Sequence, residues 1–265
     1  MKILMLYNSF EWCEQQMVKY LKIKRHVVTQ KHINDFNFKC AHEFDVILNR
    51  VMPSVAKRDI NFDLTNYVLN LMSIYENIIF INSTIAAIAD CDKKFSSNRM
   101  KYFGVSTPKI YELEEIKYPV IIKPAMSGRC IGLKKCDNEE ELKHFKSFSG
   151  YILQEYVKST LPFDYRICVC NGEILFGFTR SLINGWMGAV NKGSKTKKLD
   201  VIPQEVEEIA IAASESIKAS INGIDIIITK DGPTVIENNP TPNFSEPYIE
   251  MLGFNPVEQI IDKLF

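Results

Sequence analysis

Oxygen-bearing side chains gather at the end of a predicted β-hairpin near the C-terminus. Residues 223–239 read as two apolar strands around Asp231-Gly232, with Asp225 in the first strand and Glu237 and Asn239 in the second. Because alternate side chains of a strand share a face, Glu237 and Asn239 point the same way. Two carboxylates and an amide are hard ligands that suit Mg²⁺ or Mn²⁺, so we expect a divalent-cation site. Taken alone, the trio also fits a hairpin that simply ends in water.

The register of this hairpin decides which side chains converge. A loop of three residues, 231–233, would place Asn239 opposite Asp225 and turn the whole trio to one face. A two-residue loop would turn Asp225 to the opposite face, and Pro233 favours the longer loop. The prolines of the following segment, 240–242, stop the strand just past the candidate ligands.

A lysine and a loop of small residues form a second candidate site, for phosphate. Lys123 ends an apolar strand, and the loop behind it contains Ser127 and Gly128. Backbone N–H groups of such a loop, beside a positive charge, can hold phosphate oxygens. The sequence contains no Walker motif, so this is not a Walker loop. The alternative interpretation is a solvated lysine followed by an ordinary turn.

A polar pair, Gln154-Glu155, interrupts the apolar run of residues 151–157. A glutamate in such a place is often an edge-strand residue. It also fits a strand-like hinge whose backbone faces a nucleobase.

The elements that would position these residues differ between the two parts of the chain. Residues 2–7, 44–49 and 77–81 are short apolar runs typical of buried parallel strands, and 58–76 carries an apolar stripe at helical spacing. Strands that alternate with helices predict a small α/β layer. The first strand is not followed by a GxGxxG motif, which argues against dinucleotide binding there.

Beyond a polar segment that begins near residues 85–92, short strands joined by turns predominate. Asn171-Gly172, flanked by apolar runs, predicts another tight hairpin. One helix interrupts the strands, and the pattern predicts that it starts near Pro203 and ends at Asn222-Gly223. The chain therefore reads as α/β in its first third and α+β in the rest.

Composition argues against several classes of protein. Lys plus Arg and Asp plus Glu number 32 each, so the formal net charge is zero. No overall positive electrostatic field therefore favours binding to nucleic acid or to an anionic membrane. The apolar runs are too short to span a bilayer, and the N-terminus lacks the features of a signal peptide. Seven cysteines with irregular spacing and no CxxC pair indicate reduced thiols in a cytoplasmic protein rather than a disulfide framework or a zinc site.

In chain order these segments resemble the ATP-grasp superfamily, and within it carboxylate–amine ligases like the ribosomal-protein S6 glutamate ligase and the LysW aminoadipate ligase. The order runs Asp92-Lys93, VIIKP with SGRCIG, LQEYV, Asp164-Tyr-Arg166, Thr179-Arg180 and GIDII with GPTVIENNPTP. The resemblance implies an α/β N-terminal layer (pre-ATP-grasp), residues 1–89, that binds substrate. An α+β ATP-grasp fold would follow, with a central subdomain, 90–157, and a C-terminal subdomain that carries the metal site, 158–265.

The resemblance also implies a role for each matching residue. It assigns two Mg²⁺ or Mn²⁺ ions to Asp225, Glu237 and Asn239. Arg166 and Arg180 match arginines that face the reacting carboxylate and phosphate, and Arg50 matches one that faces substrate, although a surface arginine fits Arg50 equally. ATP binding is assigned to Lys93, Lys123, Ser127, Gly128, Gln154, Glu155, Tyr156, Val157 and Asp164, with the lysines at the phosphates, the backbone of 155–157 at the adenine and Asp164 at the ribose.

Two positions depart from the family pattern. Cys130 stands where a middle glycine of the phosphate loop is expected. Ala189 stands where related ligases tend to carry an asparagine near the metals. Either Asn191 substitutes for it from a shifted register, or the second metal is held differently. These departures leave the identity of the substrate more open than the use of ATP.

The implied reaction joins a carboxylate to an amine and releases ADP. The γ-phosphoryl group of ATP would pass to the carboxylate, and the amine of an amino acid such as glutamate would attack the resulting acyl phosphate. The implied partners are a small-molecule, peptide or carrier-protein carboxylate and an amino-acid amine, and related ligases are commonly dimers or tetramers. Two alternatives stay open: another ATP-grasp reaction, such as carboxylation or thioester formation, and a catalytically inert ATP-binding module.

Overall fold

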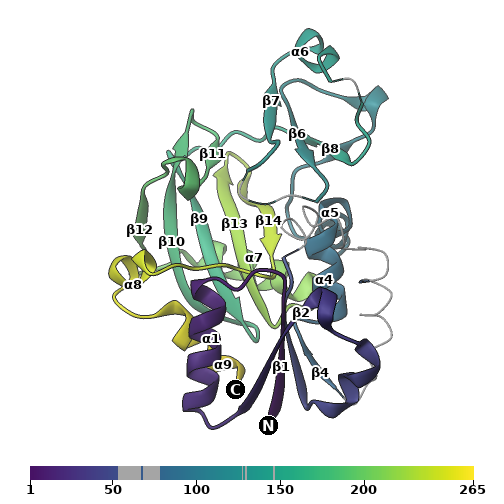
Figure 1. Ribbon diagram of the computed structural model, residues 1–265. Coiled ribbons are helices and arrows are strands. Elements are labelled where there is room, and N and C mark those ends of the chain that lie inside the picture. The colour runs from purple at the N-terminus through teal and green to yellow at the C-terminus, as the bar shows by residue number, and fades with distance from the viewer. Residues whose placement is uncertain (53–66, 68–77, 127, 129, 146) are drawn as a thin grey trace.

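The computed structural model describes residues 1–52, 67, 78–126, 128, 130–145 and 147–265. These residues form three sheets, arranged as a lower N-terminal layer, a large sheet and a small upper sheet in Figure 1. The predicted helix over 58–76, apart from Tyr67, and the predicted phosphate contact Ser127 lie outside the described residues.

The N-terminal layer is a parallel sheet with the strand order β2-β1-β3-β4. The predicted α/β layer is therefore confirmed, and so are its strands near 2–7, 44–49 and 77–81. The edge strand β2 was not predicted because its sequence, VVTQKH, is half polar and exposed along much of its length. The elements are β1 (Lys2–Tyr7), α1 (Trp12–Ile23), β2 (Val27–His32), the 3-10 helices η1 (Ile33–Asp35) and η2 (Phe38–Glu43), β3 (Val46–Arg50) and β4 (Ile79–Ile81).

A small antiparallel sheet with the order β5-β8-β6-β7 follows two helices. The second helix is capped by Asp92, whose side chain accepts hydrogen bonds from two backbone N–H groups. Lys93 is thereby fixed at the first helical position. The elements are α4 (Thr84–Cys91), α5 (Lys93–Tyr102), β5 (Ile110–Tyr111), η3 (Leu113–Glu115), β6 (Val120–Pro124), β7 (Lys134–Cys136), α6 (Glu139–Lys143) and β8 (Tyr151–Glu155).

The large sheet is antiparallel, with the order β11-β10-β9-β13-β14 and β12 paired to β10. One helix, α7, packs its apolar stripe on one face of this sheet. Together with the small sheet it forms the predicted α+β part, so the predicted fold class is confirmed. The elements are β9 (Phe163–Cys170), β10 (Glu173–Ile183), β11 (Met187–Gly188), η4 (Val190–Lys192), β12 (Thr196–Lys198), α7 (Gln204–Ser216), β13 (Ile221–Thr229), β14 (Gly232–Asn239), α8 (Pro247–Leu252) and α9 (Pro256–Leu264).

The hairpin between β9 and β10 turns at Asn171-Gly172, as predicted. Both residues have positive φ, 50° and 79°, which is the backbone that a two-residue type I′ turn requires.

The hairpin between β13 and β14 has a different register from the favoured one. Its loop is the two residues Lys230-Asp231, because Thr229 pairs with Gly232. The three-residue loop was therefore the wrong choice. A bulge at Ile236 then shifts the pairing by one position, so that Asp225 lies directly opposite Glu237. The two carboxylates share a face after all, because of a bulge that the sequence did not reveal.

The end of α7 was also predicted wrongly. The helix ends at Ser216, and Asn222-Gly223 lie inside β13. Asn222 is fully buried and accepts a hydrogen bond from the backbone N–H of Asn239 (2.9 Å). At Gly223 a Cβ atom would lie 2.9 Å from Arg166 Nη1. These residues therefore serve strand packing rather than helix termination.

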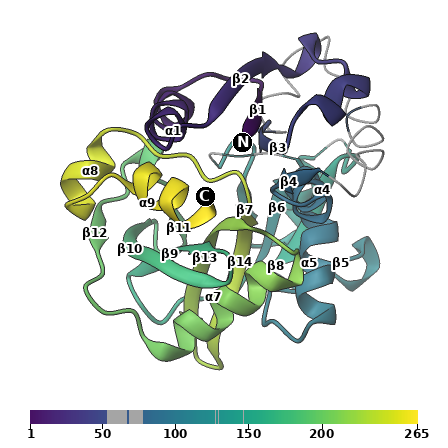
Figure 2. The same cartoon turned by 90° about the horizontal axis from the view of Figure 1, so that it is seen from below.

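One hydrophobic core joins the N-terminal layer to the large sheet. It contains Ile3 and Met17 from the layer, Phe176 from β10, and Val257 and Ile261 from α9. Figure 2 shows α9 between α1 and the large sheet. Within the described residues, no helix combines the length and apolar character needed to cross a bilayer. The core described above therefore fixes the N-terminal layer and the large sheet relative to each other, whereas the small sheet has a hydrophobic cluster of its own.

Candidate active site

A cavity of about 560 Å³ lies where the small sheet, the large sheet and the N-terminal layer meet. All the described residues with a predicted role, except Arg50, line it. They are Lys93, Lys123, Gly128, Gln154, Glu155, Tyr156, Val157, Asp164, Arg166, Arg180, Asp225, Glu237 and Asn239.

Two lysines and one glutamate form the centre of the cavity. Lys93 Nζ lies 2.5 Å from Glu237 Oε1. Burial alone raises the pKa of Glu237, but the charges of Lys93 and Lys123 outweigh it and hold the pKa at about 2. Burial lowers the pKa of Lys123 to about 8, although Glu237 opposes this shift. Glu237 is therefore ionised at neutral pH, whereas Lys123 is a buried cation close to losing its proton.

Two arginines, Arg166 on β9 and Arg180 on β10, contact Asp225 on β13. Arg166 Nε and Arg180 Nη2 each lie 3.0 Å from Asp225 Oδ1. Arg180 also donates from Nε and Nη2 to the two oxygens of Asp164, at 2.9 and 2.7 Å. Burial raises the pKa of Asp164 in spite of Arg180. Asp164 thus holds the guanidinium of Arg180 at the cavity wall.

The acids at this wall fit a divalent cation. Asp225 Oδ1 is a buried oxygen that makes no hydrogen bond of good geometry to a described residue, in spite of its two ion pairs. Asn239 donates from Nδ2 to the carbonyl oxygen of Gly223 (3.0 Å), a bond that does not use its amide oxygen. Among the described side chains, no three of the types His, Cys, Asp and Glu gather into a metal centre. A cation held by Asp225, Glu237 and Asn239 would therefore need further ligands, such as phosphate oxygens.

Part of the cavity lining is apolar, and Pro108, Ile121, Leu133, Val157 and Ile227 belong to it. The polar pair Gln154-Glu155 also lines the cavity. Glu155 ends β8 and accepts a hydrogen bond from the backbone N–H of Lys109 through its side chain (3.1 Å). An apolar lining with a few polar groups suits an aromatic ring with polar edges, such as a nucleobase.

The positions that depart from the family pattern also face the cavity. Cys130 has a φ of 53°, in the left-handed region, so it adopts the backbone of the glycine it replaces. Its carbonyl oxygen accepts a hydrogen bond from Lys192 Nζ (3.2 Å). Ala189 is buried, and Asn191 lines the cavity near it. Cys130 thus has a backbone conformation that favours glycine, and Asn191 is an amide that lines the cavity.

Arg50 is neither on the surface nor at the cavity. It is 1% exposed and forms an ion pair with Glu14, whose Oε1 lies 2.8 Å from Nη2 and 2.9 Å from Nε. The charge of Arg50 is thus neutralised by Glu14 inside the N-terminal layer.

The sequence analysis missed several polar residues of the cavity, among them Glu11, Asp90 and Asn243. Burial raises the pKa of Asp90 to about 6, although a hydrogen bond from Thr241 opposes the shift. Asp90 and Asn243 lie next to recognised segments, but nothing in a single sequence marks Glu11 at the start of α1.

This arrangement is that of the ATP-grasp fold, with a cavity between two sheets lined by lysines on one side and by acids on the other. Residues 96–264 match the family model described as "RimK-like ATP-grasp domain". The chain belongs to this family.

Among curated proteins, the coenzyme gamma-F420-2:alpha-L-glutamate ligase of Methanocaldococcus jannaschii is 31% identical to this chain. The match covers 59% of this chain and 55% of the relative, so the chain spans less than two thirds of that relative's length. The alpha-aminoadipate–LysW ligase of Sulfurisphaera tokodaii is 22% identical over 98% of this chain and 96% of its own. The solved structure of the ATP-grasp ligase PsnB with a minimal precursor, Mg and ADP has a TM-score of 0.71 at 15% identity. The structural match covers 99% of this chain and 96% of the PsnB chain. This likeness shows the shared fold.

Proposed function

We propose that the protein is an ADP-forming, ATP-dependent ligase that joins a carboxylate to an amine. The observation that carries the proposal is the convergence of Lys93, Lys123, Arg166 and Arg180 on the paired acids Asp225 and Glu237 in one cavity. Such a set neutralises a triphosphate and leaves a reacting carboxylate between cations. Residues 1–89 would serve as the substrate-binding layer, 90–157 as the central subdomain and 158–265 as the C-terminal subdomain.

We assign the two lysines and the backbone near Gly128 to the phosphates of ATP, and the apolar part of the cavity lining to the adenine. Asp164 would lie beside the ribose and orient Arg180. Asp225, Glu237 and Asn239 would hold Mg²⁺ or Mn²⁺, as two ions. Bound there, the metal would supply Lewis-acid polarisation of the phosphate oxygens.

The residues of this chain would act by positioning and by charge. Arg166 and Arg180 would hold the substrate carboxylate in line with the γ-phosphoryl group, which passes to the carboxylate oxygen and leaves ADP. The amine nitrogen then attacks the acyl carbon, phosphate leaves, and a proton from the amine goes to solvent. This chemistry requires no nucleophilic side chain.

We propose an α-amino acid, with L-glutamate as the first candidate, as the amine. The acceptor would be a carboxylate on a small molecule, a peptide or a small carrier protein. Support comes from relatives whose names state glutamate or aminoadipate–LysW ligation. The free thiols of the seven cysteines agree with a reducing, cytoplasmic setting.

ADP release tests this proposal. Native protein with Mg–ATP would be assayed with L-glutamate as the amine. The carboxylate would be N-acetyl-L-glutamate, N-acetyl-L-aspartate or a peptide ending in glutamate. The masses of the products would be measured by mass spectrometry. We expect ADP release that depends on both substrates, an amide product, and loss of both on chelation of the metal. A product containing carbonate or a thioester would identify another ATP-grasp reaction. ATP binding without ADP release from any pair would identify an inert module.

A further inference from the structure

One tyrosine lines the cavity and has no part in the assignments above. Tyr248 belongs to α8, the short helix that comes after β14, and its side chain is half-buried. Within the described part of the chain, its hydroxyl forms no hydrogen bond. A phenol carries one O–H donor, so this hydroxyl is available to a ligand in the cavity.

Aromatic neighbours hold the ring of Tyr248. Its centroid lies 5.4 Å from that of Phe178, on β10, and 5.6 Å from that of Phe244. Both phenylalanines are buried and belong to the core that joins the N-terminal layer to the large sheet. The orientation of the ring is therefore restricted before any ligand binds, which reduces the entropy cost of binding.

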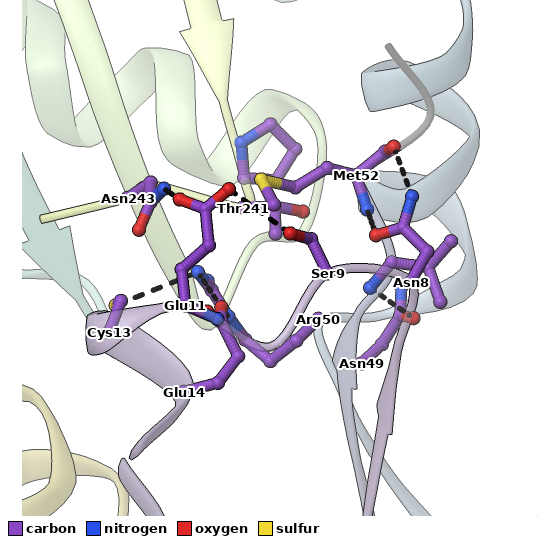
Figure 3. A network of polar contacts seen from close by, with 12 residues as sticks. Asn8, Ser9, Glu11, Cys13, Glu14, Asn49, Arg50, Met52, Thr241 and Asn243 are labelled. Atoms are coloured by element: carbon purple, nitrogen blue, oxygen red, sulfur yellow. Dashed lines mark hydrogen bonds and ion pairs between the residues drawn. The ribbon is translucent and has the colours of Figure 1, made fainter. Parts of the chain in front are cut away.

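The loop between β14 and α8 is held on two sides. Thr241 Oγ1 donates a hydrogen bond to Asp90 Oδ2 (2.7 Å). Asn243 Nδ2 donates one to Glu11 Oε2 (2.9 Å), a contact that is visible in the close view of Figure 3. Together with the buried ring of Phe244, these contacts fix the segment that brings α8 to the cavity.

The hydroxyl of Tyr248 lies within the electrostatic reach of the arginines. Burial raises the pKa of Tyr248, while the charges of Arg166 and Arg180 lower it and that of Asp225 raises it. Because the net shift is upward, the phenol keeps its proton at neutral pH. Tyr248 therefore meets this charged cluster as a neutral hydrogen-bond donor.

Both arginines retain donors that the neighbouring acids do not use. Arg166 contacts Asp225 through Nε and the carbonyl oxygen of Gly223 through Nη1. Arg180 contacts Asp164 and Asp225 through Nε and Nη2. Arg166 Nη2 and Arg180 Nη1 take no part in these contacts. Since two acids balance the two guanidinium charges, a substrate carboxylate at this wall depends on directed hydrogen bonds as well as on charge.

We propose that the Tyr248 hydroxyl donates a hydrogen bond to the substrate carboxylate that Arg166 and Arg180 hold for phosphoryl transfer. This inference rests on the proposed ligase function and names a further residue that binds and orients the acid substrate. One carboxylate oxygen would face the γ-phosphoryl group while the other accepts from the phenol. This additional donor restricts rotation of the carboxylate, so that the reacting oxygen stays in line with the phosphorus.

Tyr248→Phe tests the contact, because it removes the hydroxyl and keeps the ring that packs on Phe178 and Phe244. The carboxylates of the panel above would be varied at saturating Mg–ATP and L-glutamate. We expect kcat/KM for the carboxylate to fall about 10-fold to 100-fold, as for loss of a hydrogen bond to a charged group. The KM for Mg–ATP and the midpoint of thermal melting should stay unchanged.

The matched control is Tyr102→Phe, the same change at a residue of α5 that is 86% exposed, and it should alter none of these quantities. An unchanged kcat/KM for every carboxylate in Tyr248→Phe would overturn the proposal. A parallel rise in the KM for Mg–ATP would also overturn it, since that would place the hydroxyl at the nucleotide. So would a lowered melting midpoint with equal losses for all substrates, which would assign the hydroxyl to the fold.

Calorimetry separates failure of this contact from failure of the ligase proposal. The carboxylates of the panel would be titrated into native protein and into Tyr248→Phe, each saturated with Mg²⁺ and the non-hydrolysable β,γ-imido analogue of ATP. We expect at least one acid to bind native protein, with a Kd at least about 10-fold weaker for the variant. Equal Kd values, or no binding of any acid to native protein, would contradict the contact.

The two assays together distinguish the possible failures. If native protein forms an amide and Tyr248→Phe forms it equally well, only the role of Tyr248 is lost. If native protein releases no ADP with any pair of substrates, the ligase proposal fails, and the titration still decides whether Tyr248 binds a carboxylate.

Discussion

At the scale of single residues, the cavity contains one cation that differs from the rest. Lys93 is paired with Glu237, and Arg166 and Arg180 share Asp225. Within the described part of the chain, Lys123 forms no ion pair and is only 7% exposed. Burial therefore lowers its pKa to about 8. A buried lysine without a direct counter-ion is prepared for an anionic ligand, and the phosphates of ATP would restore its ordinary pKa.

This pKa predicts how ATP binding depends on pH. Below about pH 8 Lys123 is protonated and attracts phosphate, and as the pH rises through 8 the free protein loses that charge, so the KM for ATP should rise. In Lys123→Arg the guanidinium stays charged over this range, so the rise should disappear. Steady-state kinetics from pH 6.5 to about 9.5 would measure both proteins. An equal rise in both would show that another group is responsible.

Replacement of Glu237 should lower turnover rather than stability. Glu237→Ala removes the carboxylate that pairs with Lys93 and that we assign to the metal, and turnover should fall roughly 10²–10³-fold. The matched control is Glu173→Ala, which breaks an exposed ion pair with Lys263 and should leave turnover unchanged. ADP release, followed by a coupled assay, measures the effect, and full activity of Glu237→Ala would contradict the assigned role.

At the scale of elements, the site depends on small irregularities in the β13–β14 hairpin and its neighbour. The bulge at Ile236 turns Asp225 toward Glu237, and the missing side chain of Gly223 makes room for Arg166. Arg166 Nη1 donates to the carbonyl oxygen of Gly223 (2.9 Å), so the arginine lies flat on the strand. Regular strands at these positions would separate the charges that the cavity brings together.

Two glycine substitutions should separate activity from stability. In Gly223→Ala the new Cβ would push Arg166 away, and since Arg166 ends in a flexible side chain, the fold should tolerate the change while turnover falls at least about 10-fold. In Gly172→Ala the turn must hold a φ of 79°, which should cost about 1 kcal/mol of stability and leave turnover unchanged. Thermal melting and ADP release on both variants would test this, and equal losses of activity would refute it.

The same elements show what the sequence could and could not predict. Periodicity and turn residues identified the strands near Lys123 and Asp225, and chain-order resemblance identified most of the charged residues that line the cavity. The bulge at Ile236 has no signature, because the extra residue is an ordinary apolar one inside an apolar strand. Arg50 was predicted to face substrate, but a single sequence does not show that Glu14, thirty-six positions earlier, takes its charge inside the fold.

At the scale of the molecule, the N-terminal layer and the large sheet are joined by polar contacts as well as by the shared core. Asn82, which follows β4, is 4% exposed. Its Nδ2 donates to the carbonyl oxygens of Ile221 (2.7 Å) and Pro240, and its Oδ1 accepts from the backbone N–H of Ile221 (2.9 Å). The side chain thus ties the layer to β13 and to the segment that follows β14.

Loss of this link should destabilise the protein. Asn82→Leu would leave the N–H and C=O groups that face Asn82 at Ile221 buried and unpaired, at about 1–3 kcal/mol each. The free energy of unfolding, from urea titration, should therefore fall by about 2 kcal/mol or more. Gln30→Leu, at an exposed position of the same layer, should change it little. A loss no greater than that of the control would mean that the contact is not formed in solution.

The packing of α9 against α1 limits how this chain can be recombined with its relatives. Replacing the first 89 residues by those of a relative would bring a foreign α1 against Val257, Ile260 and Ile261, which are fully buried here. Such a chimera would lose packing between α1 and α9 unless the last ten residues were replaced as well. Helices α1 and α9 therefore have to be exchanged together for their contact to be kept.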